Sequence, residues 1–117
     1  MMHLFHITTQ LQWQQAQQLG EYWAESLETE GFIHTSKRDQ VLWVANQFYR
    51  GQPDLVLLTI DPAKVQPVIR YETVPDVPVD SEFPHIYGPL NLDAVVTASV
   101  FTPGADGLFD QAAISNG

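Results

Sequence analysis

Hydrophobic residues in this chain gather in short blocks separated by polar and proline-containing segments. The most continuous block is 55–60, Leu-Val-Leu-Leu-Thr-Ile, with Pro-Asp before it and Asp-Pro after it. A run of this kind is typical of a central strand covered on both faces. Further strands are predicted at 4–8, 32–34, 68–73 and 95–101.

Two helices are predicted in the N-terminal half of the chain. The first follows Thr8 or Thr9, either of which fits an N-cap, and ends at Gly20. The second is expected to start at Ser36, which has an aspartate three residues later as in a capping pattern, and to end at Gly51. Its expected core face consists of Val41, Val44, Ala45 and Phe48. Because helices and strands do not alternate, we expect an α+β domain with a mixed or antiparallel sheet.

The length of 117 residues, of which 44% are hydrophobic, suffices for one hydrophobic core. We therefore expect a single domain over residues 1–103. The Gly, Ala, Asp and Asn content beyond it predicts a loosely ordered C-terminal tail over 104–117. The segment 74–80, Val-Pro-Asp-Val-Pro-Val-Asp, predicts an irregular loop and a candidate lid over a site.

The charge of the chain narrows the classes of partner. Fourteen acidic residues against five basic residues give a net charge of -9, which repels phosphate backbones, so we expect no nucleic-acid partner. The absence of cysteine excludes disulfides, a thiol nucleophile and thiolate metal sites. No signal-peptide pattern opens the sequence and no segment reaches membrane-spanning length, so a cytoplasmic protein without membrane contact is expected. The sequence does not indicate an oligomeric state.

Two segments carry the candidate chemistry. Residues 31–36, Gly-Phe-Ile-His-Thr-Ser, and 83–90, Phe-Pro-His-Ile-Tyr-Gly-Pro-Leu, each place a histidine among apolar residues beside hydroxyl groups. Because imidazole changes charge near neutral pH, we predict that His34 and His85 face one pocket as catalytic candidates, with Tyr87 beside them. The expected ligand-binding residues are His6, Thr35, Ser36 and Arg70.

These residues also admit other interpretations. If Ser36 caps a helix, the N–H groups at the same turn can hold a phosphate or carboxylate, although a simple cap is the plainer interpretation. No metal site is expected, because His3 and His6 point to opposite faces of a strand and no His-x-His or His-Glu-x-x-His occurs. A serine hydrolase is disfavoured, because Gly-x-Ser-x-Gly is absent and no acid is placed in sequence to orient a histidine.

The order of these motifs, with Leu-Phe-His-Ile-Thr at 4–8 preceding the two histidine segments, resembles the DUF952 family of small bacterial proteins of unknown function. The resemblance covers nearly all of residues 3 to 101. It implies a fold similar to the ADP-ribosyltransferases and RNA 2'-phosphotransferases, which hold NAD or an ADP-ribosylated group in the cleft of a split sheet.

The resemblance also implies roles for individual residues. In those transferases an Arg or His on the first strand contacts a ribose, and His6 matches this position. A Ser-Thr-Ser segment on the second strand lines the nicotinamide pocket, and residues 34–36 match this segment. A third-strand glutamate usually drives the chemistry, but Glu82 here precedes the motif. We therefore expect a protein that binds a nucleotide or NAD-like metabolite, with no cofactor certain. The alternative is an ADP-ribosyltransferase-like or 2'-phosphotransferase-like enzyme.

Overall fold

The central strand of the fold is β4 (Leu55–Ile60), in which every residue is buried. It lies between β1 (Leu4–Thr9) and β8 (Val95–Phe101), and both pairings are antiparallel. The computed structural model describes residues 2–115. Burial on both faces explains the uninterrupted apolar run at this strand and confirms its prediction.

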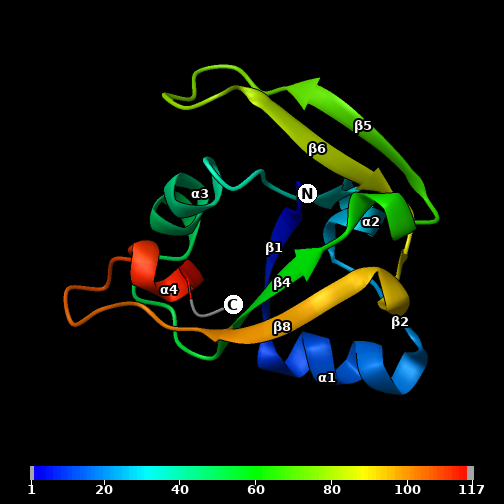
Figure 1. The fold of residues 1–117 in the computed structure, drawn as a ribbon, viewed down its shortest axis with the longest axis horizontal. Helices are drawn as coiled ribbons and strands as arrows, with labels where there is room; N and C mark the ends of the chain where they lie inside the picture. Colours follow the sequence, from blue (N-terminus) through cyan, green and yellow to red (C-terminus); the bar gives the residue numbers. More distant parts are fainter. Residues whose placement is uncertain (1, 116–117) are drawn as a thin grey trace.

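Alternate residues of this sheet enter two separate hydrophobic clusters. Leu58 belongs to the cluster that contains residues of α1 (Gln10–Leu19), whereas Leu57 belongs to the cluster of α3 (Val41–Phe48) and α4 (Gln111–Ser115). In Figure 1, α3 and α4 lie together, away from α1. The sheet therefore separates two cores, each covered by its own helices.

A second sheet has the order β3-β6-β5, formed by Ile33–His34, Glu82–Tyr87 and Val68–Thr73. A small two-stranded sheet pairs β2 (Glu21–Tyr22) with β7 (Leu90–Asn91). All pairings between these strands are antiparallel. The described residues thus form a single α+β domain with split antiparallel sheets, as predicted in outline.

An isolated bridge between β1 and the segment after β3 joins the two three-stranded sheets. The backbones of Phe5 and Ser36 exchange two hydrogen bonds, each with an N···O distance of 2.8 Å. Figure 1 shows the β5–β6 hairpin extending from this region, with its loop above α3. The hairpin, the helix and β1 therefore surround the space in which the candidate site lies.

The remaining elements are short, and the first helix is confirmed. Thr9 caps α1, because its side-chain oxygen accepts a hydrogen bond from the Gln12 backbone at 3.1 Å. Gly20 ends it in a left-handed conformation with φ of 94°. The other helical segments are α2 and the two 3-10 helices η1 and η2, at Ser26–Thr29, Pro62–Lys64 and Leu92–Ala94. None of the helices among residues 2–115 is long and apolar enough to cross a membrane.

The second helix differs from its prediction at both ends. It begins at Val41 and not at Ser36, because the Ser36 backbone is used in the bridge to Phe5. Tertiary pairing has overridden the local capping pattern, so no helix N-terminus lies at Ser36 to hold an anion. Phe48, predicted to face the core, is 68% exposed, whereas Ala45 is fully buried.

The C-terminal segment takes part in the second core. The rings of Phe109 and Phe101 are stacked with centroids 4.5 Å apart, and Ile114 is buried. The Asn46 side chain also bonds to the backbone N–H and C=O of Phe109, at 2.7 and 3.0 Å. These contacts pack part of the predicted tail against the second core. That residues 104–115 are loosely ordered stays a prediction. Residues 116 and 117 of the predicted tail lie outside the described residues.

Candidate functional site

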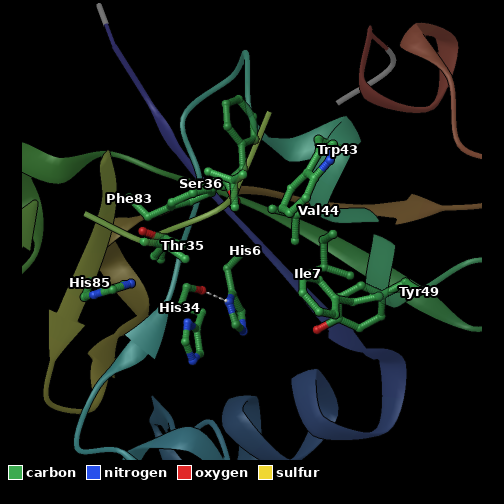
Figure 2. A pocket seen from close by; sticks show the side chains of 14 residues that line it. His6, Ile7, His34, Thr35, Ser36, Trp43, Val44, Tyr49, Phe83 and His85 are labelled. Atoms are coloured by element: carbon green, nitrogen blue, oxygen red, sulfur yellow. Dashed lines mark hydrogen bonds between the residues drawn. The ribbon is translucent and has the colours of Figure 1, made fainter. Parts of the chain in front are cut away.

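A cavity of about 500 Å³ lies between β1, α3, the β5–β6 hairpin and its loop (Figure 2). Most of its wall is aromatic or aliphatic, and polar side chains gather where the two three-stranded sheets meet. The apolar wall includes Phe5, Trp43, Val44, Phe48, Val77 and Phe83. A mostly apolar cavity with a few polar groups on one side is typical of small-molecule sites.

Most of the predicted site residues line this cavity, namely His6, His34, Thr35, Ser36 and His85. Tyr87 and Arg70 do not line it. They lie on the same face of the second sheet as His85, and the Arg70 guanidinium carbon is 5.4 Å from the centroid of the Tyr87 ring. Arg70 is exposed. Its contact with Tyr87 is a cation–π interaction beside the site.

His34 and His85 are direct cross-strand partners in the pairing of β3 with β6. Their ring centroids are 5.4 Å apart and the rings meet edge to face at 83°. Both residues line the cavity from the second sheet, and both are labelled in Figure 2. The prediction that these two histidines face one pocket is therefore confirmed; Ser36 lines it as well, whereas Tyr87, predicted beside them, does not.

The buried ring of His85 is fixed on two sides. Its Nδ1 lies 2.8 Å from Oε1 of Glu72, and the Tyr87 hydroxyl donates a hydrogen bond to the same oxygen. The Phe32 ring stacks on the imidazole, with centroids 4.1 Å apart and 23° between the planes. The hydrogen bond from Tyr87, followed by that from His85, lowers the pKa of Glu72. Its carboxylate in turn raises the pKa of Tyr87, so the charge stays on Glu72.

His34 is the more open of the two histidines. Its Nε2 lies 2.8 Å from Oε2 of Glu30, and the two side chains are 54% and 49% exposed. The expectation that no acid orients a histidine is therefore wrong, since Glu30 and Glu72 each hold one. Sequence reasoning missed both glutamates and also missed Phe32, which contacts both imidazole rings.

His6 is bonded within the protein through both ring nitrogens. Its Nδ1 donates to the His34 carbonyl at 2.5 Å, and its Nε2 is hydrogen-bonded to the Tyr22 hydroxyl at 2.7 Å. Tyr22 continues the chain to the Thr8 hydroxyl at 2.9 Å. Burial lowers the pKa of His6 to about 4 and raises the pKa of Tyr22 to about 12. The His6 ring is therefore neutral near pH 7 and offers no unbonded nitrogen to a ligand.

Two polar side chains next to Ser36 are also bonded within the protein. The Thr35 hydroxyl donates to the Pro84 carbonyl at 2.6 Å. Lys37 is paired with Asp80 at 2.6 Å, and this hydrogen bond raises the pKa of the lysine and lowers that of the aspartate. The cavity therefore presents little positive charge.

Gln40 fastens the proline-containing loop beside the cavity. This side chain is fully buried, and its Nε2 donates to the carbonyls of Asp80 and Glu82 at 2.8 and 2.7 Å. Its Oε1 accepts a hydrogen bond from the Lys37 backbone at 2.8 Å. Because Val74 and Val77 line the cavity, the loop forms part of its wall at the position expected for a lid.

A second, more open hollow of about 340 Å³ adjoins the cavity and shares His6 and His34 with it. Its wall includes Glu25, Ser26, Thr29 and Glu30, so it is more polar. Within residues 2–115, no group of three His, Asp or Glu side chains is arranged to hold a metal ion.

Comparisons with known proteins place the fold among uncharacterised relatives. A family model described as "Protein of unknown function (DUF952)" matches residues 7–98. The chain is similar to the crystal structure of protein CC0527 from Caulobacter crescentus, with 26% identity, a TM-score of 0.84, and coverage of 94% of this chain and 95% of that chain. The solution NMR structure of CC0527 gives a TM-score of 0.73, with coverage of 92% and 91% at the same identity. No curated protein matches the chain.

Proposed function

The chain belongs to the DUF952 family of proteins of unknown function, and on the geometry of its site we propose that it binds a small molecule with a planar, uncharged ring. A nucleotide or an NAD-like metabolite is the ligand class we favour, with its uncharged base inside the cavity; in an NAD-like metabolite this base is the adenine, because the oxidised nicotinamide ring is positively charged. The observation that carries this proposal is the cavity of about 500 Å³ with a largely aromatic and aliphatic wall and three histidines among its lining residues.

The charges around the cavity argue that any phosphate of the ligand lies outside it. The chain has a net charge of -9, and the nearby Lys37 is already paired with Asp80. The turn at Ser36 offers no helix N-terminus, because α3 begins at Val41. Burying a phosphate without a partner would cost far more than the apolar contacts of a ring contribute. The ring of the ligand therefore supplies most of the affinity.

The proposal is tested by measuring thermal shifts of the protein with adenosine, nicotinamide, NAD and ribose 5-phosphate. We expect stabilisation by the compounds that contain a planar aromatic ring and none by the sugar phosphate. A ligand at about one hundred times its dissociation constant adds about 2.7 kcal/mol.

Two loop variants provide a matched pair for this test. Val77→Glu places a charge at the cavity wall, whereas Val79→Glu places it on the same loop away from the wall. We expect only Val77→Glu to lose the shift, while both variants melt near the wild-type temperature. If no compound with a planar aromatic ring stabilises the protein, or if both variants lose the shift equally, the cavity is not the binding site.

A second candidate function is transfer or hydrolysis at the ribose of an NAD-like or ADP-ribosylated substrate, of the ADP-ribosyltransferase or 2'-phosphotransferase kind. The observation that favours it is Glu72, a carboxylate on the strand next to β6 and bonded to His85 and Tyr87. An anion at this place would stabilise positive charge that develops on a sugar during bond cleavage.

Incubation with NAD separates the two candidates. Under the binding proposal, nicotinamide release does not exceed that of a protein-free control. Release that disappears in Glu72→Gln but persists in Glu82→Gln would instead place the transfer reaction first. The second variant is the matched control, because the Glu82 side chain has no hydrogen bond to either histidine among the described residues.

A further inference from the structure

His85 lines the cavity and keeps one ring nitrogen without a hydrogen-bond partner among the described residues. The residue is only 5% exposed and its side chain lines the cavity wall. Its Nδ1 is bonded to Glu72, but no group within residues 2–115 forms a hydrogen bond with its Nε2. Nε2 is not among the fully buried polar atoms of residues 2–115 that lack a partner, so it is accessible to a small molecule, which makes this nitrogen a candidate contact for a ligand.

The partner on the other side of the ring determines which hydrogen-bonding role Nε2 takes. An ionised carboxylate only accepts hydrogen bonds, so Nδ1 of His85 carries the proton that it shares with Glu72. In the neutral imidazole the other nitrogen is then an acceptor. The stacked Phe32 ring and the hydrogen bond from Tyr87 to Glu72 hold this arrangement in place.

The other two histidines of the wall do not offer the same group. Both nitrogens of His6 are bonded within the protein, and the His34 side chain is 54% exposed at the rim. A ligand at the rim competes with water for its hydrogen bonds, whereas a ligand inside the cavity does not. His85 is therefore the buried acceptor among the described histidines of this wall.

We infer that Nε2 of His85 accepts a hydrogen bond from the bound ring, so that the cavity selects rings with an N–H or O–H at their edge. This inference rests on the proposed binding function and adds the chemical class of the ligand to it. A ring that has only acceptors at that edge would leave Nε2 without a hydrogen bond. It would also bring a lone pair of the ligand against the lone pair of Nε2. Protonation of His85 would convert Nε2 into a donor and would remove the preference.

Three indoles of nearly equal shape test the inference by NMR titration of the wild-type protein. Indole and 3-methylindole keep the ring N–H, whereas 1-methylindole has lost it and carries the same added methyl group. We expect 1-methylindole to bind about tenfold more weakly than 3-methylindole, the ratio that corresponds to the loss of one buried hydrogen bond. Equal affinities of the two methyl isomers would overturn the inference and leave the proposed binding function intact.

A long-range proton–nitrogen spectrum of ¹⁵N-histidine-labelled protein provides a second test that requires no variant. Before any addition, His85 should be protonated at Nδ1, and Nε2 should show the shift of an unprotonated nitrogen that moves when indole is added. A proton on Nε2 in the neutral ring would overturn the inference whatever the indoles do. If none of the three indoles binds, the proposal of a ring-binding cavity fails, and the inference fails with it.

Discussion

The burial of His6 predicts how the stability of the protein depends on pH. In the folded protein, burial lowers its pKa from 6.5 to about 4, whereas an unfolded histidine keeps the ordinary value. Between these two values the unfolded chain binds a proton that the folded protein does not. Stability from this residue is therefore fully present above about pH 6.5 and is lost progressively as the pH falls to about 4.

The size of the loss follows from the gap between the two pKa values. Each unit of difference corresponds to about 1.36 kcal/mol, so a change from 6.5 to about 4 amounts to about 3 kcal/mol. Domains of this size are stable by about 5–15 kcal/mol. Protonation of the buried His6 ring would thus remove a large part of the free energy of unfolding.

Urea unfolding followed by tryptophan fluorescence measures this loss, from neutral pH down to about pH 4. The variant His6→Gln removes the titrating group, and His3→Gln is the matched control because His3 shows no hydrogen bond among the described residues. We expect the wild-type protein and the control to lose about 3 kcal/mol more than His6→Gln over this range. Parallel curves for all three proteins would refute the assignment of His6 as a buried neutral histidine.

The other predictions concern the lid, the helix beside the cavity and a helix end. Gln40→Leu leaves three backbone groups without their partner and should cost about 2 kcal/mol in urea unfolding, whereas Lys37→Met removes an ion pair at the surface and should cost less than about 1 kcal/mol. Ala45→Asp should fail to give a cooperative thermal transition because it buries a charge, while Val44→Asp, at the cavity wall, should fold and lose the thermal shift with adenosine. Gly20→Ala forces a side chain into a left-handed conformation with φ of 94° and should lower the free energy of unfolding by about 1 kcal/mol; an unchanged value would show that the turn relaxes.

Strands were predicted well wherever local pattern and tertiary environment agree. The bounds of 55–60, 68–73 and 95–101 match β4, β5 and β8, because apolar runs there end at proline or at turn residues. The start of the second helix was predicted wrongly because a capping pattern is a local signal. Ser36 instead pairs with Phe5, more than thirty positions earlier in the chain, which no local pattern reveals.

The sequence predicts the histidines of the candidate site but not the groups that orient them. Glu72 reaches His85 only because β5 and β6 are neighbouring antiparallel strands, and the register of that hairpin cannot be derived from the composition of its strands. Glu30 lies four positions before His34, and this spacing is typical of a side-chain contact on one helix. In this protein the contact instead spans the turn between α2 and β3. Phe32 lies two positions from one histidine, and its stacking on the other requires the cross-strand pairing to be known.

The way Gln40 fastens the hairpin loop has a practical consequence for protein engineering. The anchor bonds to main-chain carbonyls at the end of the loop, so it does not depend on which side chains the loop carries. Val74 and Val77 supply the loop's share of the cavity wall. A library that randomises these two positions while keeping Gln40 and the loop length would therefore change the shape of the cavity and keep the hydrogen bonds that hold the loop. Such a library offers a route to proteins that recognise new ligands.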